Sequence, residues 1–239
     1  MSRLRTALVF AGVFLAATSA VATADAPAGT SVHIGITTNT LFRGVSQTSD
    51  SDFYHMGGKT GMATSTTTTD DDVFAPALYG GVDYQHASGF YAGAAATTVD
   101  IPGADAVLRV DGFGGYRQQL QSGLRWDAGA IVYTFPGEGD FNFWEVYAGL
   151  GYGPVGGKVW YDPVNHDTYY QATFDFDVGS GLDLSLYAGH YALDTGPDYT
   201  DFGVRISKAF GGLRVGAGLA DTDIDNAIPY LYLTYRLPH

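Results

Sequence analysis

The sequence predicts an all-β protein, a closed antiparallel transmembrane β-barrel of about 12 strands. Three observations support this fold class. Apolar and polar residues alternate with a period of two in segment after segment. Aromatic residues stand at the ends of the apolar faces, and the connectors between segments are alternately short and long.

The clearest alternation lies in residues 141–161, which read FNFWEVYAGLGYGPVGGKVWY. Every second residue from Trp144 to Tyr152 falls on one face, and the pattern resumes after a Gly153-Pro154 corner. The spacing predicts a β-hairpin. One of its faces is aliphatic in the middle and aromatic at both ends, which is typical of strands that cross a bilayer.

The same period predicts strands along the rest of the chain. A first strand begins at Val32 and fades near Leu41 and Phe42. The connectors after the even-numbered strands are short, whereas those after the odd-numbered strands are longer and acidic, as in barrels with short periplasmic turns and long outer loops. The later strands are expected at 77–86, 90–99, 106–118, 124–135, 141–152, 155–161, 168–178, from 182 onward, 202–210, 213–220 and 229–237.

The first residues predict export. Arg3 and Arg5 precede an apolar run from Ala7 to Ala17 that is too short for a transmembrane helix, and small residues follow it. We therefore expect residues 1–24 to be a signal peptide that is removed, and residues 25–239 to form a single outer-membrane barrel domain of a Gram-negative bacterium. A Thr/Asp-rich segment at 47–75 is expected to be a long mobile loop of this domain.

The composition restricts the partners. Without the predicted signal peptide the chain has 10 basic and 25 acidic residues, a formal charge of 10 − 25 = −15, which excludes a nucleic-acid partner. Only three lysines and two glutamates remain in this part, too few for the surface of a soluble barrel. The expected partners are outer-membrane lipid and small hydrophilic solutes or ions, and the oligomeric state stays open. There is no cysteine, so no disulfide is expected.

Charged residues recur on the strand face opposite the apolar one. Arg or Lys facing lipid at the midplane costs roughly 2 to 4 kcal/mol, so these side chains are expected to line the lumen. They could pair and fill a narrow barrel, or line and select a water path; a barrel of about 12 strands lies between filled and open barrels. The eight cations and seven anions are Arg43, Arg109, Arg117, Arg125, Lys158, Arg205, Arg214 and Arg236, and Asp83, Asp111, Asp127, Glu145, Asp175, Asp177 and Asp183.

No cofactor, metal or catalytic site is predicted. The acidic run that begins at Asp221 resembles the start of a calcium loop, but Asn226 stands where glycine is needed and Tyr232 where the bidentate glutamate belongs. The histidines are scattered without ligand spacing, and no nucleophile elbow occurs. A triad assembled from separate strands stays an open alternative, because spacing alone does not exclude it.

The surplus negative charge is concentrated in the predicted long loops, where Lys59 is the opposing cation. A mouth of one sign concentrates counter-ions, so we expect a weak cation preference that salt screens. The seventeen acids concerned are Asp50, Asp52, Asp70, Asp71, Asp72, Asp100, Asp105, Glu138, Asp140, Asp162, Asp167, Asp194, Asp198, Asp201, Asp221, Asp223 and Asp225.

Four ordered motifs resemble a known family. They are FRGVSQ at 42–47, GGVDYQHASGFYAG at 80–93, YTFPG followed by FWEVYAGLGYGPV within 133–155, and DYTDFGVRISKAFGGL at 198–213. Together they are similar to the TorF-type porin family of proteobacteria. The resemblance implies an outer-membrane barrel and a channel, with no assigned solute.

The predicted function is therefore that of a porin, a passive diffusion channel for small hydrophilic solutes with a weak cation preference, and not an enzyme. Two alternatives remain from the sequence. One is a plugged structural or binding barrel without transport, which the opposed lumen charges favour. The other is an outer-membrane hydrolase.

Overall fold

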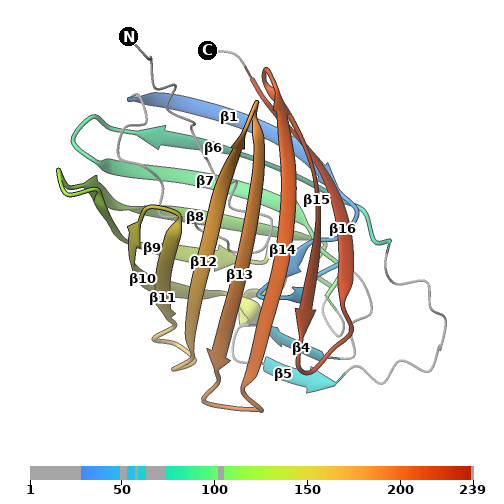
Figure 1. Cartoon of the computed structure of the whole chain (residues 1–239). Helices are drawn as coiled ribbons and strands as arrows, with labels where there is room; N and C mark the ends of the chain where they lie inside the picture. Colours follow the sequence, from blue (N-terminus) through green and yellow to red (C-terminus); the bar gives the residue numbers. More distant parts are fainter. Residues whose placement is uncertain (1–27, 49–52, 57–58, 63–73, 102–104, 238–239) are drawn as a thin grey trace, which may run out of the picture.

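Twelve antiparallel strands close into one barrel in the computed structural model (Figure 1). The structure describes residues 28–48, 53–56, 59–62, 74–101 and 105–237. Around the barrel the order is β1-β16-β15-β14-β13-β12-β11-β10-β9-β8-β7-β6, and β1 closes the sheet by pairing with both β16 and β6. The predicted fold class is confirmed.

The wall strands follow the predicted alternation. One 3-10 turn, η1 (Gly139–Phe141), interrupts a long connector, and no helix of the described residues is long and apolar enough to cross a membrane. The wall strands are β1 (Gly29–Thr37), β6 (Ala77–Gln85), β7 (Phe90–Thr98), β8 (Leu108–Gln119), β9 (Leu124–Thr134), β10 (Phe143–Tyr152), β11 (Val155–Tyr161), β12 (Thr168–Gly179), β13 (Leu182–Ala192), β14 (Tyr199–Phe210), β15 (Leu213–Thr222) and β16 (Ile228–Arg236).

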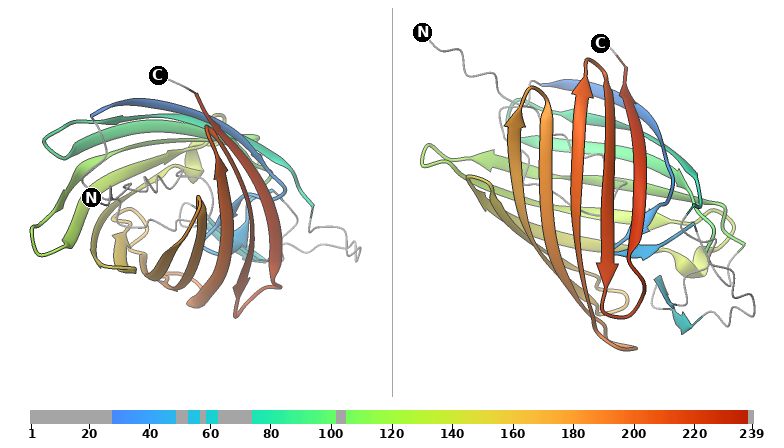
Figure 2. Two further views of the ribbon diagram at one scale, coloured as in Figure 1. Left: turned by 45° about the horizontal axis from the view of Figure 1, so that its top comes forward. Right: turned by 45° about the vertical axis from the view of Figure 1, so that its right-hand side comes forward.

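The two ends of the barrel differ in their connectors. Short turns join the strands at one end, where β1 begins at Gly29 and β16 finishes at Arg236 (Figure 2). The longer connectors all lie at the other end. We call these the short-turn end and the long-loop end.

The first strand is shorter than the sequence predicts. β1 ends at Thr37, and the residues near Leu41 and Phe42 belong to a separate hairpin, β2 (Leu41–Phe42) and β3 (Val45–Ser46). A second hairpin, β4 (Phe53–Met56) and β5 (Lys59–Met62), lies within the segment 47–75 that is expected to be a long mobile loop. The predicted signal peptide and residues 63–73 lie outside the described residues.

The two faces of the wall differ in chemistry. On β13, Leu184 and Leu186 face outward, whereas Ser185 and Tyr187 face inward and are each 5% exposed. The interior thus holds the polar and most of the buried aromatic side chains, and the exterior holds exposed aliphatic ones. This arrangement is the reverse of a soluble protein.

Interior tyrosines lie across glycines of the neighbouring strands. A Cβ at Gly216 would overlap the ring of Tyr232 on β16, and one at Gly218 would overlap the ring of Tyr230. The same relation joins Tyr169 to Gly189 and Tyr187 to Gly203. These four glycine–tyrosine pairs follow one packing scheme, in which the missing side chain makes room for a ring.

This packing predicts a specific loss of stability. Gly216→Ala should lower the free energy of unfolding by about 1–3 kcal/mol, because the added methyl group collides with the buried Tyr232 ring. Gly112→Ala is the matched control, since nothing lies within 4 Å of a Cβ there. Urea unfolding of both variants in lipid vesicles would measure the difference, and equal stability of the two would contradict the packing scheme.

Candidate functional site

The β2–β3 hairpin lies inside the barrel, toward the long-loop end (Figure 2). All residues from 39 to 47 are buried. The chain reverses at Arg43 and Gly44, whose φ angles are 51° and 83°. Two positive φ angles are the signature of the tight turn that joins antiparallel strands, and a non-glycine residue there carries backbone strain.

Arg43 at the hairpin tip binds across the lumen to Glu145 on β10. Its Nη2 donates to Oε1 of Glu145 at 2.5 Å, and each side chain is 1% exposed. The guanidinium carbon also lies 4.6, 4.4 and 4.3 Å from the ring centroids of Phe42, Tyr169 and Tyr191. Burial alone lowers the pKa of a guanidinium, but the carboxylate of Glu145 raises the net pKa of Arg43 above its ordinary value. Arg43 therefore stays charged.

Arg109 on β8 binds Gln47, the residue that follows the hairpin. Its Nη1 donates to Oε1 of Gln47, and its Nε lies 3.1 Å from Oδ1 of Asp111. Phe42 packs edge-on against Tyr133, with ring centroids 5.7 Å apart. The buried Arg43–Glu145 ion pair thus fixes the hairpin to β10, and the hydrogen bond from Arg109 to Gln47 fixes the residue that follows the hairpin to β8.

The hairpin also contacts the remaining side of the wall. Leu41 clusters with Tyr79 and Tyr232 of β6 and β16. A Cβ at Gly44 would lie 2.6 Å from Cγ2 of Thr222 and 2.8 Å from Cβ of Asp201, so the turn abuts β15 and β14. Because these contacts reach strands around the whole circumference, the hairpin obstructs the lumen at the long-loop end.

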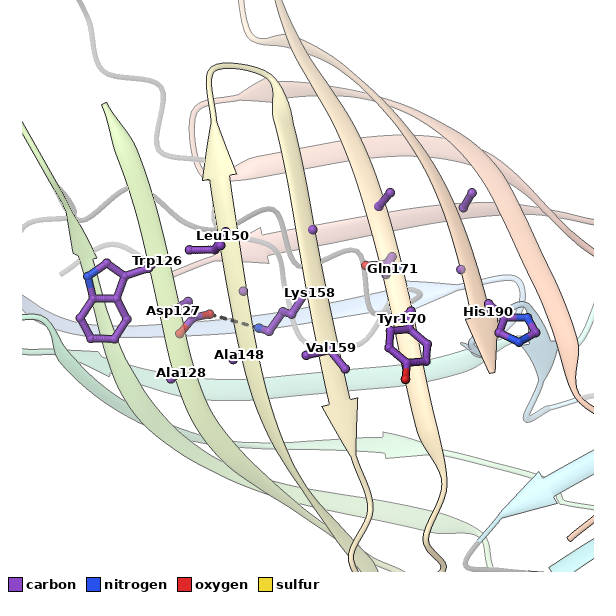
Figure 3. A pocket seen from close by; sticks show the side chains of 15 residues that line it. Trp126, Asp127, Ala128, Ala148, Leu150, Lys158, Val159, Tyr170, Gln171 and His190 are labelled. Atoms are coloured by element: carbon purple, nitrogen blue, oxygen red, sulfur yellow. Dashed lines mark hydrogen bonds and ion pairs between the residues drawn. The ribbon is translucent and has the colours of Figure 1, made fainter. Parts of the chain in front are cut away.

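A second charged group lies nearer the short-turn end, between β7 and β11. Nζ of Lys158 donates to Oδ2 of Asp127 at 3.1 Å (Figure 3). The Tyr91 hydroxyl donates to Oδ1 of Asp127 at 2.5 Å and lies 2.6 Å from the Tyr147 hydroxyl. Arg117 stacks over the Tyr91 ring at 3.9 Å. This group joins two cations and one anion on one side of the lumen.

Other predicted lumen residues form small separate groups. Nη1 of Arg214 donates to Oδ2 of Asp183 and, at 2.8 Å, to Oγ of Ser207. The Ser185 hydroxyl donates to Asp175. Three others lie elsewhere: Arg125 donates to the Gly153 carbonyl at 2.9 Å, Asp177 accepts from the Gly179 amide, and Arg205 is half-buried opposite Ser185.

The short-turn end of β1 contributes the last group. Nδ1 of His33 lies 3.3 Å from Oδ2 of Asp83, and Arg236 is the register partner of His33 on β16. The structure therefore brings Arg43 and Glu145 together with Arg109 and Asp111, but spreads the remaining charges over the short-turn half. In the part of the chain that the structure describes, no group of three or more metal-ligating side chains occurs.

Three acids that the sequence assigns to the outer mouth are buried at the long-loop end. Asp162, Asp167 and Asp201 are 0%, 2% and 0% exposed. Oδ1 of Asp162 accepts from the amides of Val164 and Asn165, and Asp201 accepts from the Tyr169 hydroxyl. These three do not face outer water, so that assignment needs correction. The sequence signals the burial of Asp162 alone. Its Asp162-x-x-Asn165 spacing favours a turn in which the Asp162 side chain accepts hydrogen bonds from the following backbone amides.

The exterior carries an apolar depression of ≈1160 Å³ over β9 to β13 (Figure 3). Small residues line much of it, and Trp126, Tyr170 and His190 stand among its larger outward side chains. Nothing in the described residues covers it.

A family model described as "Bacterial protein of unknown function (Gcw_chp)" matches residues 67–235. The chain belongs to the Gcw_chp family. The match begins after β1 and the β2–β3 hairpin. The family description carries no TorF designation, so the TorF-type resemblance stays a prediction. A search of curated proteins finds no match to this sequence.

Among solved structures, this Gcw_chp chain is similar to porin barrels. The "KdgM porin" aligns with TM-score 0.56 and 6% identity over 88% of this chain and 100% of that one. The "NanC porin" aligns with TM-score 0.54 and 8% identity over 87% of this chain and 98% of that one. Another structure is titled "KdgM porin in complex with disordered oligogalacturonate". At these identities the likeness shows the shared fold.

Proposed function

We propose that this Gcw_chp protein is an outer-membrane porin, a passive diffusion channel for small hydrophilic solutes whose lumen the β2–β3 hairpin restricts. The observation that supports it best is the closed barrel with an apolar exterior and a charged interior. The likeness to the KdgM and NanC porins is consistent with it. Export after removal of residues 1–24, and a single domain over 25–239, belong to the same proposal.

The exterior supports a membrane location. Ile34, Leu78 and Leu231 are 57%, 59% and 60% exposed. They lie on β1 and on its two neighbours β6 and β16, where the first and last strands of the chain close the barrel. Aromatic side chains flank this band near the short turns, as at Tyr152, and near the long loops, as at Trp144. An apolar surface of this extent is unfavourable in water but matches the hydrocarbon core between two interfaces.

A pair of adjacent substitutions tests the membrane-facing surface. Leu184→Asp should prevent assembly of a heat-resistant barrel, because it places a carboxylate against lipid. Ser185→Asn should be tolerated, since this inward side chain can keep its hydrogen bond to Asp175. Asparagine is uncharged, so it adds no like charge beside Asp175. Gel mobility with and without heating measures how much folded barrel each variant forms. Equal amounts of folded barrel for the two variants would contradict the proposal.

The hairpin favours a second candidate, a plugged structural or binding barrel without transport, because it contacts the wall on all sides of the lumen. Conductance of the purified protein in a planar bilayer separates the two. The channel predicts discrete current steps, whereas a silent membrane would favour the plugged barrel.

A hydrolase has less support in the structure. A Ser–His hydrogen bond occurs at His86 and Ser88 in an exposed turn, and a His–Asp pair at His33 and Asp83, but the two groups share no residue. A lipid or peptide hydrolysis assay on the purified barrel is expected to show no activity.

We also propose a weak cation preference set by acids of the long loops. With Asp162, Asp167 and Asp201 buried, it rests on the remaining acids, among them Asp223 on the exposed surface. Neutralising Asp70 to Asp72 together with Asp221, Asp223 and Asp225 should shift the reversal potential in a salt gradient toward zero. High salt should have the same effect. A wild-type preference for chloride would contradict selection by the loops.

A further inference from the structure

We propose that Glu145, Tyr133, Tyr169 and Tyr191 form a binding site for guanidinium cations, which Arg43 of the hairpin occupies in this structure. The hairpin would then be a self-docked gate, and solutes that carry a guanidinium group would compete with it. The binding site stands on the geometry of these residues. Only the consequence for transport rests on the proposed channel.

The wall residues have the chemistry of a cation site. Tyr169 and Tyr191 present ring centroids 4.4 and 4.3 Å from the guanidinium carbon, from two neighbouring strands. Glu145 supplies the negative charge, and the Tyr133 hydroxyl orients it by donating to Oε2 at 3.1 Å. Aromatic faces combined with a carboxylate recognise organic cations, and both terms are strong where water is excluded.

The occupant uses this site incompletely. Nη2 of Arg43 donates to Glu145, but Nε and Nη1 have no hydrogen-bond partner in the described part of the chain. A guanidinium and a carboxylate can form two parallel hydrogen bonds when both are free to align. Arg43 is tied to a turn with φ of 51°, which fixes its approach. A free guanidinium is not restricted in this way and can form the second bond.

The charges of the wall require a cation here. Asp111 has Arg109 as its partner at 3.1 Å, whereas Glu145 has Arg43. Glu145 is 1% exposed beside Arg43, and once Arg43 leaves, its carboxylate loses the compensating cation. A guanidinium is more weakly hydrated than an ammonium ion, so it loses less on entering such a site. The site should therefore prefer guanidinium to ammonium.

The test removes the occupant and offers a free one. Purified Arg43→Ala barrel in detergent should gain thermal stability in methylguanidinium, with a half-saturating concentration at least tenfold below that of methylammonium. The wild type, whose site is filled, should respond at least tenfold more weakly. The double variant Arg43→Ala/Glu145→Gln should lose the response, because the carboxylate is gone. Equal Tm shifts in the single and double variants, or none in either, would overturn the site.

A refolding experiment keeps the proposal testable if Arg43→Ala does not fold unaided. Methylguanidinium in the refolding buffer should then restore the heat-modifiable folded form of Arg43→Ala, and methylammonium should not. Failure of methylguanidinium to restore it would contradict the site. Arg43→Gln is a second variant for the same measurement, because its longer side chain preserves more of the packing of the turn.

Tm and refolding report binding without any current. A positive Tm response in a barrel that does not conduct would leave the site intact and overturn the proposed channel. A conducting barrel without a Tm response would overturn the site and leave the proposed channel intact.

If the barrel both conducts and binds guanidinium, free arginine added to the long-loop side should raise the open time of the wild-type channel, and an equal concentration of lysine should not. No effect of arginine there would contradict the gate.

Discussion

Replacing residues 41–46 with a short glycine-serine linker should raise the single-channel conductance several-fold above that of the wild type. The replaced residues include both hairpin strands and the turn, and every one of them is buried inside the barrel. Their removal also deletes the contacts of Phe42 and Arg43 with the opposite wall. The conducting cross-section at the long-loop end would widen, and planar-bilayer recordings in one salt would measure the change.

A second linker variant controls for the disturbance of a loop. Residues 194–198 form an exposed connector between β13 and β14, and the same linker there should leave conductance unchanged. An unchanged conductance after hairpin replacement, in a barrel that still migrates as folded, would show that the hairpin does not limit the path.

Removing one partner of the Arg43–Glu145 pair should lower the free energy of unfolding by about 3–5 kcal/mol, because a charge then remains buried without compensation. Arg43→Met leaves the Glu145 carboxylate in this state, and Glu145→Leu leaves the Arg43 guanidinium. The double variant should recover most of the loss, since two apolar side chains of similar volume replace the pair. Urea unfolding in lipid vesicles completes the double-mutant cycle. Additive losses would contradict a direct interaction.

The barrel wall could be predicted from the sequence because its pattern is local. Each strand must alternate between lipid and lumen, so the period of two is visible without knowledge of any partner strand. β11 (Val155–Tyr161) begins and ends where the alternation does, and β8 (Leu108–Gln119) lies within two residues of its expected ends. The alternating connector lengths indicated closure for the same reason.

The hairpin could not be predicted in the same way. Leu41 and Phe42 are neighbouring buried residues, so they break the alternation and read as the end of a strand. The Arg43-Gly44 dipeptide is a weak turn signal. Glu145, which binds Arg43, lies 102 residues further along the chain, and a single sequence gives no indication of such a contact.

The placement of the charges was predictable only in part. Parity along a strand assigns a residue to one face, but it does not say which charges meet across the lumen. The sequence places Asp201 at the outer mouth because it lies beside a predicted long loop, yet the Tyr169 hydroxyl holds it inside. Depth inside the barrel depends on strand tilt and on the hairpin, which are long-range features.

The central claim is that the hairpin is a displaceable gate of the channel, and the absence of cysteine makes one measurement direct. Positions 44 and 222 are immediate neighbours, since a Cβ at Gly44 would overlap Cγ2 of Thr222 at 2.6 Å, and a cysteine at 222 removes that methyl group. Gly44→Cys and Thr222→Cys together should form a disulfide that keeps the hairpin inside the lumen, with each single variant as control for strain. In one bilayer, the oxidised double variant should show the lowest conductance, and a reductant should restore openings. Equal conductance before and after reduction, with the disulfide verified by thiol titration, would contradict the account.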